Sequence, residues 1–402
     1  MIKILQINTV VAKGATGMIA LDIGERINIK GWESYIIYGR KGKANSNSIL
    51  IKIGNYYDFL LHALLTRLFD KHGFGSVRTT KKIIKEIIKI DPNLIHLHNI
   101  HGYYININLL FSFLQKIKKP VIWTFHDCWP LTGHCAQFEN IGCIKWETGC
   151  NNCPKTKSYP KSISDNSKQN YLRKKQIFNR LDNLTIVCVC DWLKGIIRNS
   201  YLKNYNLEVI KNGVDLNIFK KKTEILHFQY IKNKNKFIIL GVASNWKMDK
   251  GLSDFIKLSY VLNDDFQIVL VGLSATEIEN LPKNILGLER LNNIQFLVEL
   301  YSISNVYMNL TYEDTFPTTN LEAMACGLPV IVYNTGGCKE AINNFTGFVV
   351  AKGDINSLVD KVNLIKNNTL SDYNKLSRDR VIEFFNKEDR FEEYIKLYEN
   401  LI

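Results

Sequence analysis

The sequence has no long hydrophobic run and no recognisable targeting segment. No apolar stretch reaches the roughly 18 residues that a bilayer-spanning helix needs, and the longest candidate, Ile105–Leu114, is too short and contains asparagine. The N-terminal residues MIKILQINTVV lack a signal-peptide cleavage pattern and are typical of a first β-strand. We therefore expect a cytoplasmic protein.

The sequence also lacks the even set of cysteines that a disulfide framework requires. It contains nine cysteines, and no secretory signal accompanies them. Because stable disulfides form in oxidising compartments, an odd number of cysteines in such a chain argues against a disulfide-stabilised fold.

Acidic residues are scarce in the first half of the chain. Residues 1–222 hold 34 Lys and Arg against 15 Asp and Glu, whereas residues 223–402 hold 18 against 23. The basic half suits an anionic partner, such as a membrane surface, a phosphorylated substrate or nucleic acid. The plain alternative is a solvated lysine-rich surface.

Short apolar runs alternate with helical patterns in two successive series, which predicts an α/β fold with parallel sheets. At 402 residues, the chain is long enough for two domains. We place their boundary at the lysine-rich stretch Lys220–Lys236, giving Rossmann-like domains at 1–222 and 223–386 that face each other across a cleft. A final helix over 387–402 can return to the first domain. The expected strands are Lys3–Asn8, Ser34–Gly39, Leu94–Asn99, Val121–Asp127, Leu184–Cys190, Leu207–Gly213, Phe237–Ala243, Phe266–Gly272, Asn305–Leu310 and Leu328–Asn334.

The stretch EDTFPTTNLEAMACGLPVI (Glu313–Ile331) predicts a strand end, a turn at Pro317 and a short helix from about Thr319 to Cys326. The free N–H groups and positive dipole end of such a helix form an anion site suited to a pyrophosphate. Glu322, one turn into the helix, can accept two hydrogen bonds from a ribose diol. Asp314, in the preceding loop, can accept bonds from sugar hydroxyls.

These residues resemble the signature of retaining GT-B glycosyltransferases of family 4, E-x7-E followed by A-x-A-x-G-x-P-V-I. Here Asp314 replaces the first glutamate, with Glu313 beside it. VIKNGVDLNIF (Val209–Phe219) and CVCDWLKGIIRNS (Cys188–Ser200) resemble further family segments, so the resemblance covers nearly the whole chain. It is greatest to bacterial polysaccharide-biosynthesis members with a Cys-rich insert.

The resemblance implies a donor site for a nucleotide-diphosphate sugar in the second domain. The segment GVASNWKMDKGLSDFI (Gly241–Ile256) resembles the family's phosphate-binding segment, with Lys250 before a helix start. The family's arginine is missing, and Lys247 is the residue that can compensate. The implied donor-side residues are Gly14, Gly17, Lys247, Lys250, Glu313, Asp314, Phe316, Thr318, Thr319, Asn320 and Glu322.

Three stretches of the first domain extend this site. Gly14 and Gly17 follow the first strand and allow close approach of the backbone to a phosphate or sugar. His126 ends a strand in FHD, which resembles the family's T-x-H-D, and is implied to lie beside the donor sugar with Asp314 and Lys250 as catalytic residues. His98, Asn99 and His101 follow another strand and are acceptor-side candidates.

An insert at 128–160 is rich in cysteine. Cys135, Cys143, Cys150 and Cys153 are spaced C-x7-C-x6-C-x2-C, which permits a structural zinc site that rigidifies the loop. The alternative is a set of buried thiols in a loop packed by Trp129, Trp146 and Tyr159.

The resemblance implies a retaining, metal-independent transferase that acts on a saccharide or lipid-linked acceptor in cell-surface polysaccharide biosynthesis. No cofactor is expected for catalysis, and the metal-chelating Asp-x-Asp pattern of other glycosyltransferases is missing from the sequence. The basic first domain would contact the anionic inner membrane, and nucleic acid is not expected as a partner. Two alternatives remain: another GT-B sugar enzyme of epimerase or phosphorylase type, and a basic zinc-containing nucleic-acid-binding protein.

Overall fold

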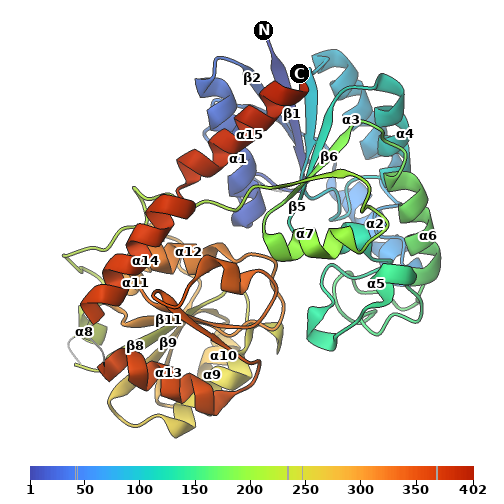
Figure 1. Cartoon of the computed structure of the whole chain (residues 1–402). Coiled ribbons are helices and arrows are strands. Elements are labelled where there is room, and N and C mark those ends of the chain that lie inside the picture. Colours follow the sequence, from blue (N-terminus) through green and yellow to red (C-terminus); the bar gives the residue numbers. More distant parts are fainter. Residues whose placement is uncertain (41, 43, 233–234, 247, 368–369) are drawn as a thin grey trace. The chain divides into compact units, whose positions relative to one another are not determined.

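The structure is a computed structural model that describes residues 1–40, 42, 44–232, 235–246, 248–367 and 370–402. The chain forms two compact units (Figure 1), one of Met1–Lys211 with Arg390–Ile402 and the other of Asn212–Asp389. The division at 211/212 therefore lies before the sequence-based boundary at 222/223.

The first unit is built on a seven-stranded parallel sheet in the order β3-β2-β1-β4-β5-β6-β7. Its central strands are almost fully buried, as their apolar runs predict for a sheet covered on both faces. The strands are β1 (Lys3–Asn8), β2 (Glu33–Tyr38), β3 (Ile49–Lys52), β4 (Leu94–Leu97), β5 (Val121–Phe125), β6 (Leu184–Cys188) and β7 (Asn206–Val209).

Helices alternate with these strands. In α3, Ile83, Ile87 and Ile90 face the interior at helical spacing, while the intervening lysines are exposed. The helices are α1 (Gly14–Ile29), α2 (Tyr56–Phe69), α3 (Val77–Ile90), α4 (Ile107–Ile117), α5 (Lys145–Thr148), α6 (Ser167–Phe178) and α7 (Asp191–Arg198), with short 3-10 turns at η1 (Trp129–Leu131) and η2 (Glu139–Ile141).

The second unit repeats the pattern with a six-stranded parallel sheet in the order β10-β9-β8-β11-β12-β13. The expected α/β class with two Rossmann-like sheets is thus confirmed. The strands are β8 (Phe237–Val242), β9 (Phe266–Leu273), β10 (Ile285–Glu289), β11 (Val306–Asn309), β12 (Val330–Tyr333) and β13 (Gly347–Val350). The helices are α8 (Gln229–Lys232), α9 (Leu252–Val261), α10 (Ala275–Glu279), α11 (Ile294–Ile303), α12 (Thr318–Ala325), α13 (Ile355–Asn367) and α14 (Leu370–Phe384), with 3-10 turns at η3 (Met248–Lys250) and η4 (Cys338–Ala341).

The last helix, α15 (Lys387–Leu401), completes the core of the first unit. Its residues Phe391, Tyr394 and Tyr398 share an apolar cluster with Ile4 of β1 and Leu94 of β4. Tyr398 also bonds through its hydroxyl to Nδ1 of the buried His96, at 2.7 Å. The C-terminal helix therefore packs against the sheet to which the N-terminal strand β1 belongs.

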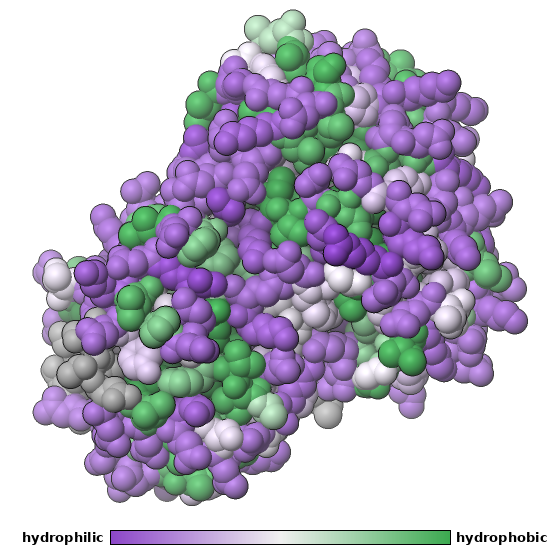
Figure 2. Space-filling view, in the orientation of Figure 1, coloured by the Kyte–Doolittle hydropathy of each residue, from purple (hydrophilic) through white to green (hydrophobic). Residues whose placement is uncertain are grey.

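The face displayed in Figure 2 is mainly hydrophilic, and its hydrophobic residues form small groups. Across the described ranges, no helix combines the length and the apolar character that crossing a bilayer requires.

Candidate active site

The carboxyl ends of β8 and β11 form the point in the second unit where the strand order reverses. The connection after β8 runs to β9 on one side, and the connection after β11 runs to β12 on the other side. Open parallel sheets bind ligands at such a point. The loop after β8 carries Lys250 and the loop after β11 carries Asp314. Asp249 joins the two loops, because its carbonyl accepts bonds from Tyr312 N at 2.8 Å and Thr311 Oγ1 at 3.1 Å.

Lys250 and Asp314 form an ion pair at this edge. Lys250 Nζ lies 2.7 Å from Asp314 Oδ2, and both side chains are partly exposed. Burial lowers the pKa of Lys250, but the charge and hydrogen bond of Asp314 outweigh it and the pKa is raised, so the amine is a cation at neutral pH. Gly251 follows with a φ of +78°, and a Cβ there would lie 2.2 Å from the Leu310 carbonyl oxygen. Only glycine permits this close approach of the two loops.

Helix α12 begins directly after the Asp314 loop. It starts at Thr318, one residue before the predicted start, and no side chain caps its N-terminus at Pro317. Asn320 is buried and bonds to Asn309 Nδ2 at 2.9 Å through its Oδ1, which fixes the helix on the end of β11. The uncapped N-terminus and the Lys250 cation therefore belong to the same strand-end region.

Glu322 lies one turn into α12. Its carboxylate accepts hydrogen bonds from Tyr301 Oη at 3.1 Å and Thr318 Oγ1 at 3.2 Å. Burial raises its pKa to about 7 in spite of these bonds. The group therefore changes charge near neutral pH.

The remaining residues of this stretch differ in accessibility. Phe316 is 4% exposed and packs on Phe385, with ring centroids 5.9 Å apart, so its side chain belongs to the core. Glu313 is also buried, whereas Thr319 is partly exposed. Lys247, the predicted second phosphate contact, lies outside the described residues.

The first unit has its own reversal point between β1 and β4. Gly14 begins α1 with a φ of +65° and is exposed, and no side chain caps that helix. Gly17 is buried, and a Cβ there would lie 3.2 Å from Ala12 N. Of the two glycines, Gly14 is therefore the one accessible to a ligand, and Gly17 closes the loop against the helix.

A chain of hydrogen bonds fixes the tautomer of His126, which follows β5. Gln6 donates from Nε2 to the Ala20 carbonyl, so its Oε1 accepts from His98 Nε2 at 2.9 Å. His98 Nδ1 is then an acceptor for His126 Nε2–H at 3.2 Å. Burial lowers the pKa of His126 to about 4, so its ring is neutral and its Nδ1 carries a lone pair.

This arrangement changes the role assigned to His98. The side chain is fully buried and both ring nitrogens are bonded within the protein. It therefore orients His126 and does not face an acceptor.

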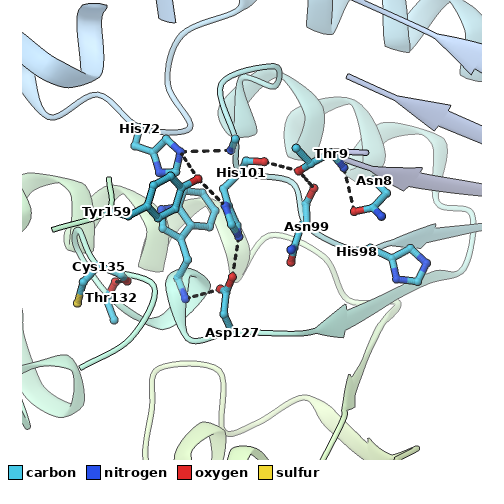
Figure 3. A network of polar contacts seen from close by, with 12 residues as sticks. Asn8, Thr9, His72, His98, Asn99, His101, Asp127, Thr132, Cys135 and Tyr159 are labelled. Carbon is cyan, nitrogen blue, oxygen red and sulfur yellow. Dashed lines mark hydrogen bonds and ion pairs between the residues drawn. The ribbon is translucent and has the colours of Figure 1, made fainter. Parts of the chain in front are cut away.

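His101 forms a dyad with Asp127, a residue that the sequence analysis did not select (Figure 3). His101 Nε2 lies 2.8 Å from Asp127 Oδ2, and its Nδ1 lies 3.2 Å from the Tyr159 hydroxyl. Burial raises the pKa of Asp127, but the charge and hydrogen bond of His101 lower it further, and the net shift is downward. Asn99 precedes this dyad, and its carbonyl accepts from Thr9 Oγ1 at 2.8 Å. The position of Asp127 next to His126 is the sequence signal that could have identified it.

The zinc site expected in the Cys-rich insert stays a prediction. Cys135, Cys143, Cys150 and Cys153 line one cavity together with His134. Within the residues that the structure describes, however, no group of three or more His, Cys, Asp or Glu side chains is arranged to hold a metal ion. None of the nine cysteines, all of which the structure describes, takes part in a disulfide, and the Cys135 and Cys153 thiols hydrogen-bond to each other. The single Cys-x-x-Cys pair fixes only two thiols at the spacing of metal ligands.

Side-chain packing contributes to ordering the insert. The rings of Phe138 and Trp146 stack at 5.1 Å. The buried amine of Lys174 lies 3.5 Å over the Trp129 ring and donates to the carbonyls of Trp129 at 2.8 Å and Thr132 at 3.0 Å. Of the three aromatic residues expected to pack the loop, Trp129 and Trp146 are buried and Tyr159 is half exposed.

Comparison with known families identifies the chain. Residues 17–218 match the family described as "Glycosyltransferase Family 4", and residues 222–383 match "Glycosyl transferases group 1". The chain belongs to glycosyltransferase family 4. It is thus an enzyme of the glycosyltransferase class.

Named relatives and solved structures agree with this assignment. The chain is 25% identical, over 99% of its length and 100% of the other protein, to the putative colanic acid biosynthesis glycosyl transferase WcaC of Escherichia coli K12. It is 26% identical, over 51% of its length and 57% of the other protein, to N,N'-diacetylbacillosaminyl-diphospho-undecaprenol alpha-1,3-N-acetylgalactosaminyltransferase of Campylobacter jejuni. HepE of Anabaena, solved in complex with UDP-glucose, superposes over the full length of both chains with a TM-score of 0.72 at 14% identity, which shows the GT-B fold.

Proposed function

We propose that this glycosyltransferase moves a sugar from a nucleoside-diphosphate sugar to a saccharide or lipid-linked acceptor, with retention of anomeric configuration. The pathway that we infer is the assembly of a cell-surface polysaccharide. The relatives named above support this pathway, because one is named for colanic acid biosynthesis and another for a diphospho-undecaprenol acceptor.

The observation that carries the proposal is the Lys250–Asp314 pair beside the uncapped N-terminus of α12. When the glycosidic bond to the donor breaks, negative charge develops on the departing diphosphate. A fixed ammonium and a helix N-terminus stabilise that charge without rearranging. In this proposal they replace a catalytic metal ion, and Glu322 accepts hydrogen bonds from the ribose diol.

Each unit is assigned its own contacts. In the second unit, Asp314 accepts hydrogen bonds from hydroxyls of the donor sugar. In the first unit, the neutral His126 offers its Nδ1 lone pair to a sugar hydroxyl. Asn99 and the His101–Asp127 dyad bind the acceptor. The acceptor oxygen attacks the anomeric carbon on the face that the diphosphate leaves, and its proton passes to the departing phosphate oxygen.

We also propose that the enzyme works at the inner face of the cytoplasmic membrane. The net charge of +19 over residues 1–222 supports this location, since anionic lipids attract basic surfaces.

A ligand screen tests the proposal. We expect UDP or GDP to raise the melting temperature of the protein and a DNA oligonucleotide to leave it unchanged. Product masses from a panel of nucleotide sugars then identify the donor. A shift with the oligonucleotide and none with any nucleoside diphosphate would contradict the proposal.

A further inference from the structure

One buried carboxylate joins three segments of the second unit. Asp254, in the first turn of α9, is fully buried, and its Oδ2 accepts hydrogen bonds from Tyr312 Oη at 2.6 Å and Tyr333 Oη at 2.9 Å. Its Oδ1 accepts a bond from Lys257 Nζ at 3.1 Å. Because a buried carboxylate is costly unless it is bonded in this way, these contacts hold it in one position.

Both tyrosines are hydrogen-bond donors at neutral pH. Burial, followed by the hydrogen bond and the charge of Asp254, raises the pKa of Tyr312 to about 12, and the same causes raise the pKa of Tyr333. A phenol that keeps its proton donates it to the carboxylate, and hydrogen bonds to a charged acceptor are the stronger kind. The two bonds to Asp254 are therefore strong and fixed in direction.

Tyr312 connects this carboxylate to the candidate active site. It lies in the loop after β11, two residues before Asp314, and its backbone N–H donates to the Asp249 carbonyl at 2.8 Å. Asp249 directly precedes Lys250, and Asp254 follows Lys250 by four residues. Asp254 thus ties the segment that carries the Lys250 ammonium to the loop that carries its partner carboxylate.

Tyr333 donates to the same oxygen of Asp254 from a different element. It is the last residue of β12 and is buried in the apolar cluster of the second unit. Its bond joins Asp254 to the sheet, whereas the bond of Tyr312 joins Asp254 to the loop of Asp314. The two hydroxyls therefore make the same kind of bond from different attachments.

We propose that Asp254 is a positioning residue, which acts through Tyr312 to hold the Lys250–Asp314 pair where the donor diphosphate binds. The inference rests on the proposed function for its donor. Asp254 itself is too deeply buried to contact the diphosphate. If the tether is lost, the loop shifts and the ammonium no longer meets the phosphate oxygen on which charge develops, and catalysis is sensitive to such displacements.

The experiment compares Tyr312→Phe with Tyr333→Phe, each of which removes one hydroxyl from the same carboxylate oxygen. Both variants should melt at a lower temperature than the wild type, because a buried acceptor loses a donor. Only Tyr312→Phe should lower kcat, by roughly tenfold, since only this change releases the loop of Asp314. Tyr333→Phe should keep kcat within about twofold of the wild type. Asp254→Asn should lower kcat at least as much as Tyr312→Phe.

A double-mutant cycle separates positioning from a general loss of stability. When Tyr312→Phe is added to Lys250→Met, kcat should fall by less than about twofold further, because the group that is positioned is already gone. A purely structural effect of Tyr312→Phe would lower kcat by the same factor in both backgrounds.

The outcomes separate this inference from the proposed function. A wild-type protein that binds neither UDP nor GDP overturns the proposed function, and this inference with it. In a wild type that binds them and transfers sugar, three results would overturn this inference alone: an undiminished kcat of Tyr312→Phe, an equal loss of kcat in Tyr333→Phe, or the full loss of kcat in the Lys250→Met background.

Discussion

The Lys250 ammonium lies 2.7 Å from the Asp314 carboxylate, although the two residues are 64 positions apart in the sequence. Neighbouring strands β8 and β11 bring their loops together, and the Asp249 carbonyl joins these loops. The carboxylate thus holds a cation beside the start of α12, where we place the donor diphosphate.

Replacing the cation should remove most of the catalytic power. We expect Lys250→Met to lower kcat by roughly 10²- to 10³-fold, because a fixed positive group no longer meets the developing charge on the diphosphate. Product formation from the identified donor measures this effect. Lys283→Met, at an exposed lysine of the same unit, is the control and should remain active. A Lys250→Met enzyme of wild-type rate would refute the assignment.

Replacing Asp314 should change the rate of sugar transfer more than the affinity for the nucleotide. Asp314→Asn removes the charge that pairs with Lys250, so UDP or GDP should bind at least as tightly as in the wild type. The rate should fall roughly ten- to a hundredfold, as expected for loss of a hydrogen bond to a charged group. Asp314→Glu restores the residue typical of the family motif and should retain more activity. Equal rates for the Asn and wild-type enzymes would exclude this role.

Binding of nucleoside diphosphates should depend on pH through Glu322. Burial raises its pKa to about 7, so the carboxylate form that accepts from the ribose diol is lost below that pH. Affinity for UDP or GDP should therefore fall as pH drops from 8 to 6, by at most about tenfold per unit. The raised pKa also makes the free energy of unfolding depend on pH. Its stabilising contribution is full below the ordinary pKa of 4.5 and is lost as pH rises through 7.

Calorimetric titration across pH tests this dependence. Glu322→Gln should bind more weakly at pH 8 and lose most of the variation. Inorganic pyrophosphate, which has no ribose, should show no contribution from Glu322. A wild-type affinity for UDP and GDP that does not vary between pH 6 and 8 would count against the ribose contact.

Replacing His126 should lower turnover without changing the affinity for the nucleotide. We expect His126→Ala to reduce kcat/KM roughly fivefold, because one neutral hydrogen bond contributes about 1 kcal/mol. UDP or GDP affinity should stay unchanged, because the nucleotide is assigned to the second unit. Since the pKa of His126 is about 4, the wild-type rate should show no histidine titration from this residue between pH 5 and 8. An equal loss of nucleotide affinity would contradict the assignment.

Apolar runs predicted the central strands well, because a strand buried on both faces leaves a continuous hydrophobic signature. The strands β3, β10 and β13 were missed. All three are edge strands with exposed positions, so none of them carries such a run. The start of α12 was displaced by one residue because capping signals do not fix a helix end.

Site residues were selected well where a sequence motif fixes the backbone. They were selected less well where burial by residues distant in the sequence decides whether a side chain is accessible. Lys250 and Asp314 could be selected from their segments, whereas the burial of His98 and Phe316 has no local signature. The zinc site stays a prediction, since the cysteine spacing brings the four thiols to one cavity but does not by itself fix a metal-binding geometry.

The most direct test is a crystal structure of the protein with a bound nucleoside diphosphate. The account predicts that the phosphates contact Lys250 Nζ and the backbone N–H groups at Thr318 and Thr319, with the ribose on Glu322. Phosphates bound elsewhere, with Lys250 still engaged only by Asp314, would contradict it.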